Sequence, residues 1–583
     1  MKLIELLRRY LAPYRWLLVG VVVLQGLQVF GTLYLPTLNA AVVDDGVARG
    51  DTATVWRLGG IMLTVAAAQV VCNVAAVWCG ARAAMAAGRN LRRDVFHRVT
   101  DMSHQDVARF TGASLITRNT NDINQVQMVV LMSATMLVMA PLMSIGGIVM
   151  ALVQSVHLSW IVVVTVVVVA VVMGFLVRRM VPSFTVMQER IDGLNSVTRQ
   201  QLTGIRVIRA FVRQGAERER FAEANTAVTD ANLRVGGLFA ILFPSAMAII
   251  NVATVAVVWF GAREVEVGTI EVGTIMAFVQ YLMLVLMGIM MASFMAMMVP
   301  RAEVAAGRLT EVTDAELTQV SHGTVREFTE RGAVAFENVT FRYPGAEAPV
   351  LDDISFRIPA GGSLAVVGST GSGKTTFANV LTRLYVPESG TVSIGGVPVD
   401  ELAPETLAGS MGIVPQQAYL FSGTIADNLR FSRPEATEDD MWWALGVAQA
   451  DFVHDLADGL SHRVNQGGTN FSGGQRQRLA IARAVVGRPD VLVFDDSFSA
   501  LDTATDSRLR GALSRAARRE AALPEGSPFT RVIVAQRVAT ARDADRILVL
   551  DSGRVAGLGT HDELLADSPV YREIVESQEG HHV

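Results

Sequence analysis

Long apolar runs that contain no Asp, Glu, Lys or Arg occupy much of the first 300 positions of this 583-residue chain. A helix needs about 20 apolar residues to cross the hydrocarbon core of a bilayer, and six of the runs reach that length. The pattern therefore predicts six transmembrane helices, at about residues 17–43, 58–81, 129–153, 158–177, 238–260 and 273–298. Only the short polar stretch 154–157 separates the third helix from the fourth, which indicates a tight turn.

The pattern changes from about residue 333, where apolar runs shorten to strand length and turn-forming residues return. Ala333–Tyr343 alternates apolar and polar positions as a half-buried strand does, while Ser363–Val367 and Val491–Phe494 are continuous runs typical of buried strands. The fold class we expect is therefore a six-helix membrane domain followed by an α/β domain. The predicted division is a membrane domain of residues 1–310, a linker of residues 311–332, an α/β domain of residues 333–578 and a tail of residues 579–583.

Arginine is distributed unequally between the loops, which predicts the orientation of the membrane domain. The loop after the second helix carries seven arginines between positions 82 and 118, and the loop after the fourth carries ten between positions 178 and 234. The three opposite loops carry only Arg49, Arg57 and Arg263. Because positive loops remain on the cytoplasmic side, the N-terminus, both long loops and the α/β domain are expected in the cytoplasm. Both long loops are permissive for helix, so the membrane helices should continue well beyond the bilayer.

Composition narrows the class of protein further. The chain is 51% hydrophobic and only 18% charged, has a net charge of −5 and contains 2 cysteines. These values exclude a disordered chain and a secreted disulfide scaffold, and they argue against a nucleic-acid partner. Charged residues within membrane helices usually mark ion or proton pathways. Their absence from all six segments argues against a proton-driven transporter and favours a hydrophobic or amphipathic substrate.

The strand at Ser363–Val367 leads directly into a glycine-rich loop with the phosphate-binding pattern. In such a loop the backbone N–H groups face the phosphates, the lysine contacts the β- and γ-phosphates, and the threonine hydroxyl binds Mg²⁺. Apart from Lys2, the loop lysine is the only lysine in the chain. We expect ATP to bind this loop, which consists of Gly368, Ser369, Thr370, Gly371, Ser372, Gly373, Lys374 and Thr375.

Two further groups suit a nucleotide site. Asp495 stands at the end of the strand Val491–Phe494, where a carboxylate can bind the Mg²⁺ of the nucleotide. A second candidate anion site, which precedes an arginine-rich helix, consists of Ser472, Gly473, Gly474 and Gln475. One nucleotide does not need two such sites in the same chain, so the second is expected to serve an ATP that another ATPase domain holds.

Six membrane segments followed by this order of motifs resemble a half-molecule of an exporter-type (type IV) ABC transporter. The resemblance covers nearly the whole chain. It implies an adenine-stacking role for Tyr343, a Walker A motif that extends to Thr376, a Q-loop at Gln416 that assists with Mg²⁺, and a D-loop that contains Asp502. It also implies that the tips of the two long loops dock on the ATPase domains, and that the fourth and fifth segments cross to a partner subunit.

The chain departs from the family pattern at two positions. The family has a glutamate after the Walker B aspartate and a histidine in the switch loop, whereas this chain has Asp496 and Gln536. Aspartate is one methylene shorter than glutamate, and a displacement of about 1 Å can lower a rate about 100-fold. Glutamine donates hydrogen bonds but cannot carry a proton between groups. The two changes predict a site that binds ATP and hydrolyses it slowly.

The signature motif retains the family pattern except for Phe471, where leucine is usual. The resemblance therefore implies a heterodimer, in which a homologous half-transporter supplies the competent base and switch. The expected function is export of drugs or lipids across the bacterial cytoplasmic membrane. The alternatives are a homodimeric exporter with Asp496 as a working base, an importer of a lipid-like substrate, and a nucleotide-gated channel.

Overall fold

The computed structural model describes residues 2–317, 323–517 and 529–579, so the predicted tail lies almost entirely outside the described residues. By contacts the chain divides into two compact units, one of Met1–Asp101 with Phe110–Glu316 and one of Met102–Arg109 with Leu317–Val583. Each unit is described by itself.

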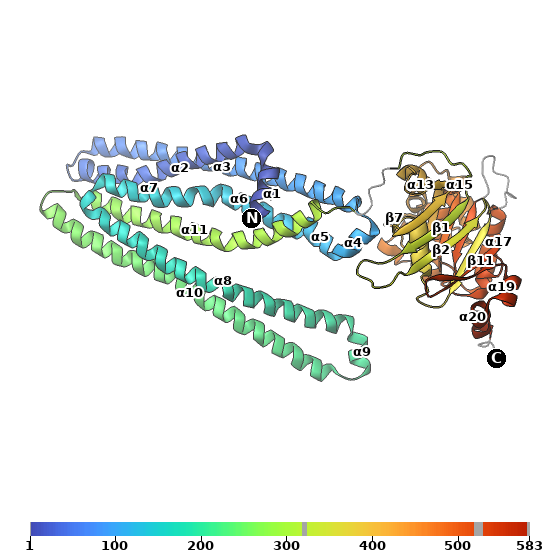
Figure 1. The fold of residues 1–583 in the computed structure, drawn as a ribbon. Coiled ribbons are helices and arrows are strands. Elements are labelled where there is room, and N and C mark those ends of the chain that lie inside the picture. Colours follow the sequence, from blue (N-terminus) through green and yellow to red (C-terminus); the bar gives the residue numbers. More distant parts are fainter. Residues whose placement is uncertain (1, 318–322, 518–528, 580–583) are drawn as a thin grey trace. The chain divides into compact units, whose positions relative to one another are not determined.

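Six helical spans, each long and apolar enough to cross a membrane, make up most of the first unit (Figure 1). They are 42 to 53 residues long, which at 1.5 Å per residue exceeds the about 30 Å of a bilayer core roughly twofold. The prediction of six spans with long extensions is therefore confirmed. The elements of this unit are α1 (Lys2–Leu11), α2 (Arg15–Ala41), η2 (Val42–Val47), α3 (Thr52–Thr100), α5 (Gly112–Thr117), η3 (Arg118–Asp122), α6 (Ile123–Met132), η4 (Ser133–Leu137), α7 (Val138–Gln154), α8 (Val156–Thr203), α9 (Ile205–Ala210), α10 (Gln214–Glu266) and α11 (Val272–Thr313).

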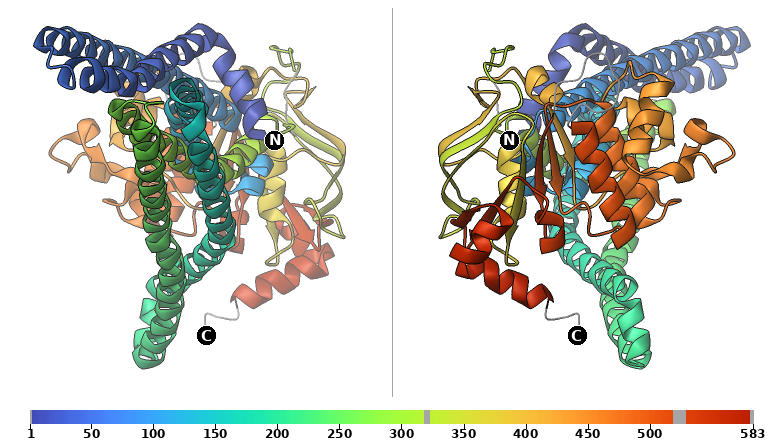
Figure 2. Two further views of the ribbon diagram at one scale, coloured as in Figure 1. Left: turned by 90° about the vertical axis from the view of Figure 1, so that its left-hand side faces the viewer. Right: turned by 90° about the vertical axis from the view of Figure 1, so that its right-hand side faces the viewer.

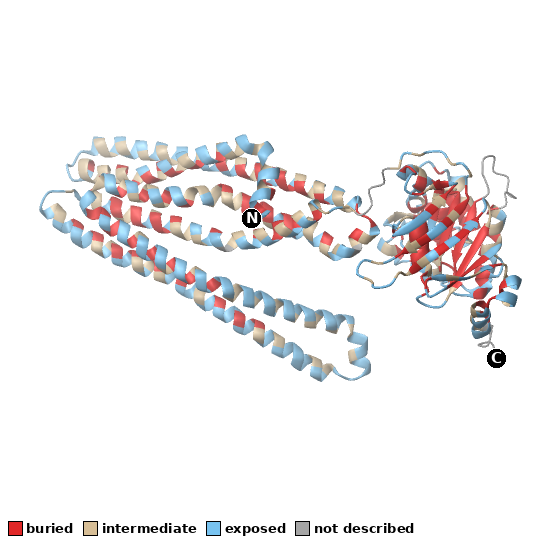
Figure 3. Cartoon of the chain, in the orientation of Figure 1, coloured by how far each residue is buried: buried red, intermediate tan, exposed pale blue. Residues whose placement is uncertain are grey.

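Helices α8 and α10 form a long antiparallel arm, which the short helix α9 closes at its tip (Figures 1 and 2). Gly204 separates α8 from α9, and at the opposite end extended backbone at Ser155 separates α7 from α8. The part of the arm towards α9 carries mostly exposed residues, whereas buried residues concentrate where α8 and α10 approach the other helices (Figure 3). The expected turn between the third and fourth spans is thus present.

Helices α2 and α11 are joined at one end by a close backbone approach. The backbone N–H of Gly273 donates to Asp44 Oδ1 at 2.7 Å. A Cβ at Gly273 would lie 2.4 Å from the carbonyl oxygen of Ala40 and 2.4 Å from Asp44 Oδ2. Further along the same pair of helices, the hydroxyls of Thr37 and Tyr281 lie 2.7 Å apart. This contact therefore requires glycine, which has no side chain, at position 273.

The second unit is built on two main sheets. A six-stranded sheet has the order β12-β11-β3-β10-β9-β6, and a four-stranded antiparallel sheet has the order β2-β1-β4-β5. The strands are β1 (Val334–Phe341), β2 (Leu351–Ile358), β3 (Ser363–Gly368), β4 (Ser389–Ile394), β5 (Val397–Pro398), β6 (Met411–Val414), β7 (Gly423–Thr424), β8 (Arg463–Val464), β9 (Val491–Asp495), β10 (Thr530–Val534), β11 (Arg546–Asp551) and β12 (Arg554–Gly559). The helices are α4 (His104–Phe110), α12 (Lys374–Leu381), α13 (Pro404–Ser410), α14 (Ile425–Arg430), α15 (Glu438–Val447), α16 (Gly473–Val486), α17 (Thr503–Ala517), α18 (Val538–Ala541), α19 (His561–Asp567) and α20 (Pro569–Glu579).

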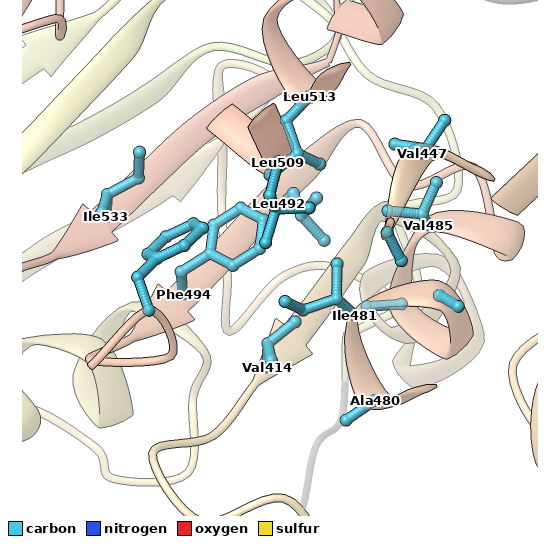
Figure 4. Close-up of a cluster of buried hydrophobic side chains, with 14 of the residues drawn as sticks. Val414, Val447, Ala480, Ile481, Val485, Leu492, Phe494, Leu509, Leu513 and Ile533 are labelled. Carbon is cyan, nitrogen blue, oxygen red and sulfur yellow. The ribbon is translucent and has the colours of Figure 1, made fainter. Parts of the chain in front are cut away.

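Strand β10 pairs in parallel with both β3 and β9, so the carboxyl ends of all three lie at one edge of the sheet. Val534 is opposite Val366 on one side and opposite Asp495 on the other. Helices pack on the sheet through a cluster of apolar side chains that includes Phe494, Ile481 and Leu509 (Figure 4). The expected α/β domain is confirmed, and its core fixes which loops meet at this edge.

We predict that Gly273→Ala destabilises the membrane unit, because the added methyl would overlap backbone and carboxylate atoms. Overpacking of this kind costs about 1–3 kcal/mol, which should lower the apparent melting temperature of the purified chain in a thermal scan. Gly20→Ala is the matched control, since its Cβ would meet nothing within 4 Å. Equal melting temperatures for Gly273→Ala and the wild type would contradict the close approach of α2 and α11.

Candidate functional site

The predicted phosphate-binding loop connects β3 to α12. Gly371 and Gly373 have φ values of 85° and 99°, in the left-handed region that glycine adopts without strain. The ammonium of Lys374 donates to the carbonyl oxygens of Gly368 at 2.8 Å and Ser369 at 2.7 Å. Burial lowers the pKa of Lys374, and the carboxylates of Asp496 and Asp495 oppose that shift. A glycine-rich loop that encloses a partly buried lysine ammonium at the N-terminus of a helix can bind the polyphosphate of a nucleotide.

Two adjacent carboxylates lie at the end of β9, Asp495 as its last residue and Asp496 directly after it. Burial, and then the charge of Asp496, raise the pKa of Asp495. The hydroxyl of Thr375 donates weakly to Asp495 Oδ1 at 3.5 Å. A desolvated carboxylate next to a second carboxylate and a hydroxyl is a donor set that suits the hard cation Mg²⁺. The residues present therefore fit the metal of a nucleotide, with Thr375 and Asp495 able to hold it.

Two glutamine side chains donate hydrogen bonds to Asp496. Its Oδ2 accepts a hydrogen bond from Gln416 Nε2 at 3.0 Å and another from Gln536 Nε2 at 2.7 Å. The side chain is 8% exposed, and the backbone has a φ of 47°, which is unusual for a residue other than glycine. The structure thus brings together the residues predicted for the base, Asp496, the switch, Gln536, and the Q-loop, Gln416.

The aromatic residue predicted to stack on adenine, Tyr343, lies two residues after β1. Its hydroxyl is 2.9 Å from Thr376 Oγ1 at the start of α12. Its ring meets those of Phe341 and Tyr385 edge to face. The ring is therefore held beside the helix that the phosphate-binding loop begins.

The second glycine motif forms the N-terminus of α16. Ser472 and Gln475 make a reciprocal capping box, with Ser472 N–H donating to Gln475 Oε1 at 2.9 Å and Gln475 N–H donating to Ser472 Oγ at 3.3 Å. Ser472 and Gly473 are exposed, and a Cβ at Gly473 would meet nothing within 4 Å. Gly474 follows within the same first turn. The helix start is thus rigid and accessible to an anion from outside the unit.

Asp502 directly precedes α17, and its Oδ1 accepts a hydrogen bond from the backbone N–H of Thr505 at 3.0 Å. This backbone hydrogen bond holds the pKa of Asp502 below its usual value. The predicted D-loop residue therefore caps a helix in this structure.

A cavity of about 680 Å³, largely open to the surface, lies on the membrane unit. Its lining combines small residues with methionine and two serines, and all of the described side chains on it are uncharged. The lining residues are Leu137, Ala140, Pro141, Ser144, Ala170, Met173, Gly174, Val177, Ile289, Ala292, Ser293, Met295, Ala296 and Val299.

The sequence did not single out these positions, although it contained a signal that could have. Ala170, Met173, Gly174 and Val177 follow the spacing of one helical face, and so do residues 289, 292, 293 and 296. Where two apolar helices face each other with small residues, space remains between them that larger side chains would fill. Hydropathy alone does not distinguish such a face from one that contacts lipid.

Comparison with known proteins agrees with this arrangement. The family model described as the ABC transporter transmembrane region matches residues 18–290, and the model described as ABC transporter matches residues 351–499. An "Uncharacterized ABC transporter ATP-binding protein" of Mycobacterium tuberculosis is 46% identical over 582 residues, which are 99% of this chain and 98% of the relative. A "Fatty acid ABC transporter ATP-binding/permease protein" of Mycobacterium bovis is 35% identical, covering 79% of this chain and 71% of the relative.

A solved structure extends the comparison to three dimensions. The structure titled "Structure of a bacterial Atm1-family ABC exporter with ATP bound" superimposes with a TM-score of 0.79 at 25% identity, covering 97% of this chain and 99% of that one. The predicted resemblance is therefore confirmed for the family and for the fold. With six membrane-capable helices fused to a nucleotide-binding ATPase domain, this chain belongs to the ABC transporter family and has the exporter-type fold.

Proposed function

We propose that the chain exports uncharged hydrophobic or amphipathic compounds, such as drugs or lipids, from the cytoplasm of a bacterium. The observation that carries the substrate class is the cavity between η4, α7, α8 and α11, whose lining is uncharged and rich in small residues. An anionic or cationic solute would lose its hydration there without gaining a counter-charge, which is costly. A relative named as a fatty acid transporter and one named "Multidrug efflux ATP-binding/permease protein" are consistent with this class.

The ATPase unit supplies the driving force in this proposal. Lys374 neutralises the β- and γ-phosphates, the left-handed glycines direct backbone N–H groups towards them, and Tyr343 stacks on the adenine. Thr375, Asp495 and Gln416 would hold Mg²⁺, which would supply charge neutralisation to the nucleotide. The accessible start of α16 completes the site of a second ATPase subunit, so that each nucleotide is enclosed between two chains.

The chain's own site is proposed to hydrolyse ATP slowly. A general base must accept a proton from water, and one oxygen of Asp496 already accepts two amide hydrogen bonds. The switch position is an amide that cannot take up a proton, and the shorter aspartate places its carboxylate farther from the γ-phosphate. The hydrogen-bonded aspartate, its shorter side chain and the glutamine at the switch position together favour bound ATP over hydrolysed ATP.

If this chain's own site is slow, a second subunit must supply a site that hydrolyses ATP efficiently. We propose a heterodimer with a homologous half-transporter that has a glutamate base and a switch histidine. The exposed tip of the α8–α10 arm, with Phe211 73% and Val212 79% exposed, offers an apolar surface for the partner's ATPase domain. The arginine-rich loops and the bacterial relatives support a multipass protein of the bacterial cytoplasmic membrane. The domain limits 1–310 and 333–578 stay predictions.

The first prediction concerns the slow site. The double substitution Asp496→Glu with Gln536→His restores the reach of the base and a group that can shuttle a proton. We expect the ATPase rate of the purified full chain to rise about 10- to 100-fold, in keeping with the cost of a misplaced base. Adding Lys374→Ala to the double variant is the control and should abolish the gain. A wild-type rate equal to that of the double variant would overturn the slow-site proposal.

The second prediction concerns the partner. Co-expression of the chain with a homologous half-transporter that has a glutamate base and a switch histidine should yield a stable complex with vigorous ATPase activity. Substituting the partner's glutamate base by glutamine should remove nearly all of this activity, whereas Asp496→Asn in this chain should remove little. A homodimer of this chain that hydrolyses ATP as fast as the complex would instead favour the homodimeric alternative.

The third prediction tests the cavity. A Cβ at Gly174 meets nothing within 4 Å, and Gly174 lines the cavity, so Gly174→Phe adds a ring at the cavity lining. A long-chain alcohol with a photoreactive diazirine should label wild-type α7, α8 and α11, with competition by the unlabelled alcohol. We expect labelling in the variant to require about tenfold more probe, a loss of about 1.4 kcal/mol.

Gly236→Phe is the matched control for the cavity test. Gly236 also faces open space, but it lies on α10 outside the cavity. Equal labelling of the wild type and of Gly174→Phe, or labelling spread evenly over all six spans, would contradict a binding cavity at this position.

A further inference from the structure

The side chain of Gln578, on the last helix of the ATPase unit, is hydrogen-bonded to the backbone of the switch loop, residues 535–538. Its Oε1 accepts from the backbone N–H of Val538 at 2.8 Å, and its Nε2 donates to the carbonyl oxygen of Gln536 at 2.8 Å. One amide therefore binds a backbone donor and a backbone acceptor on the two sides of Arg537. Two such bonds restrict the rotation of the loop backbone between them.

The contact provides an acceptor that the loop itself lacks. Helix α18 begins at Val538, and its N-cap residue, Arg537, makes no side-chain capping hydrogen bond. The first N–H groups of a helix have no partner within the helix and need an acceptor from elsewhere. Gln578 supplies one, and Val538 is buried. Because a buried donor that loses its partner is costly, removal of the glutamine amide would force the loop to rearrange.

Helix α20, which follows α19 at the end of the unit (Figure 1), is held by the same face that carries Gln578. Tyr571, Val575 and Gln578 follow the spacing of one helical face. Tyr571 is fully buried, and its hydroxyl lies 2.8 Å from His561 Nδ1. Val575 belongs to the buried apolar cluster that also contains Val538. The amide of Gln578 is thus carried by a helix that is packed against the unit.

The side chain of Gln536 extends from this loop to the nucleotide edge. Its Nε2 donates to Asp496 Oδ2 at 2.7 Å, and since an amide nitrogen carries two hydrogens, one hydrogen is left for a second acceptor. In the proposed function the carboxylate of Asp496 faces the γ-phosphate. The second hydrogen of Gln536 is then beside the γ-phosphate, which ATP has and ADP lacks.

We propose that Gln578 is a positioning residue, which holds the switch loop so that the amide of Gln536 meets both Asp496 and the γ-phosphate of bound ATP. The inference rests on the proposed nucleotide site. Both polar atoms of the Gln578 amide are bonded to the loop backbone, so the residue does not contact the nucleotide and acts through Gln536. Helix α20 thereby contributes to the preference of this site for ATP over ADP.

Equilibrium binding to the purified full chain tests this role. Affinities are measured for Mg-ADP and for the magnesium complex of the β,γ-imido analogue of ATP, which is not hydrolysed. We expect Gln578→Ala to bind the ATP analogue about three- to tenfold more weakly, part or all of one hydrogen bond. Its affinity for ADP should be unchanged. An unchanged ratio of the two affinities would overturn the proposal, and so would an equal loss for both nucleotides.

Gln578→Glu examines the donor half of the contact. Glutamate has nearly the same shape and keeps an acceptor for the N–H of Val538, but its carboxylate has no hydrogen to donate to the carbonyl oxygen of Gln536. This variant should therefore lose the preference for the ATP analogue as Gln578→Ala does, and a wild-type preference would contradict the proposal. Glu576→Ala is the matched control, because Glu576 is exposed on the same helix, and it should bind both nucleotides as the wild type does.

The double variant Gln536→Ala with Gln578→Ala tests whether Gln578 acts through Gln536. Residues that act as a unit are not additive, so the double variant should bind the ATP analogue as Gln536→Ala does. Additive losses would show that Gln578 acts by another route and would refute the proposal.

The same measurements distinguish failure of the proposed nucleotide site from failure of this inference. If the wild type binds neither nucleotide, the proposed site is wrong and the inference fails with it. If Gln536→Ala leaves the ratio of affinities unchanged, the nucleotide site stands, but the contact with the γ-phosphate is wrong. If Gln536→Ala weakens binding of the ATP analogue and Gln578→Ala does not, only the role of Gln578 is wrong.

Discussion

The parallel pairing of β10 with β3 and β9 is the constraint on which the nucleotide site depends. Val534 aligns with Val366 on one neighbour and with Asp495 on the other, and β6 extends the parallel run so that Val414 aligns with Phe494. The functional groups follow these aligned positions within a few residues. A slip of one register step would move Asp496 by about 3.3 Å relative to the loop, which is more than the length of its hydrogen bonds to the two glutamines.

Much of this arrangement could be predicted from the sequence, because the signals are local. Charge-free runs of about 20 residues predicted the six spans, and a buried strand followed by glycines and Lys374 predicted the strand-loop-helix of β3 and α12. Asp495 and Asp496, at the end of β9, were also expected at the nucleotide. In each case the chemistry lies within a few residues of the element that positions it.

The features that the sequence did not predict are those in which distant segments meet. Nothing near Gln578 indicates that its side chain meets the backbone of Gln536 and Val538, which are 42 and 40 positions away. Likewise, the hydrogen bonds from Gln416 and Gln536 to one oxygen of Asp496 join three separate loops. The cavity was missed for a related reason, since hydropathy does not tell which apolar face turns inward. Non-local side-chain contacts require the register of the sheets and the packing of the helices to be known first.

The charge of the functional site differs between the membrane unit and the ATPase unit. Lys374 is desolvated by the loop around it, and its carbonyl contacts with Gly368 and Ser369 hold the ammonium where phosphates are expected. In a chain whose other cations, apart from Lys2, are arginines, this position keeps the compact donor that such a loop can enclose. The membrane cavity has the opposite character, with an uncharged lining. Binding energy at the cavity is therefore expected to come from apolar contact. At the nucleotide site, by contrast, charge interactions are strong, because Asp495 and Asp496 lie close to Lys374. Because the six predicted membrane segments contain no Asp, Glu, Lys or Arg, a buried charge there would lack a counter-charge, which is costly.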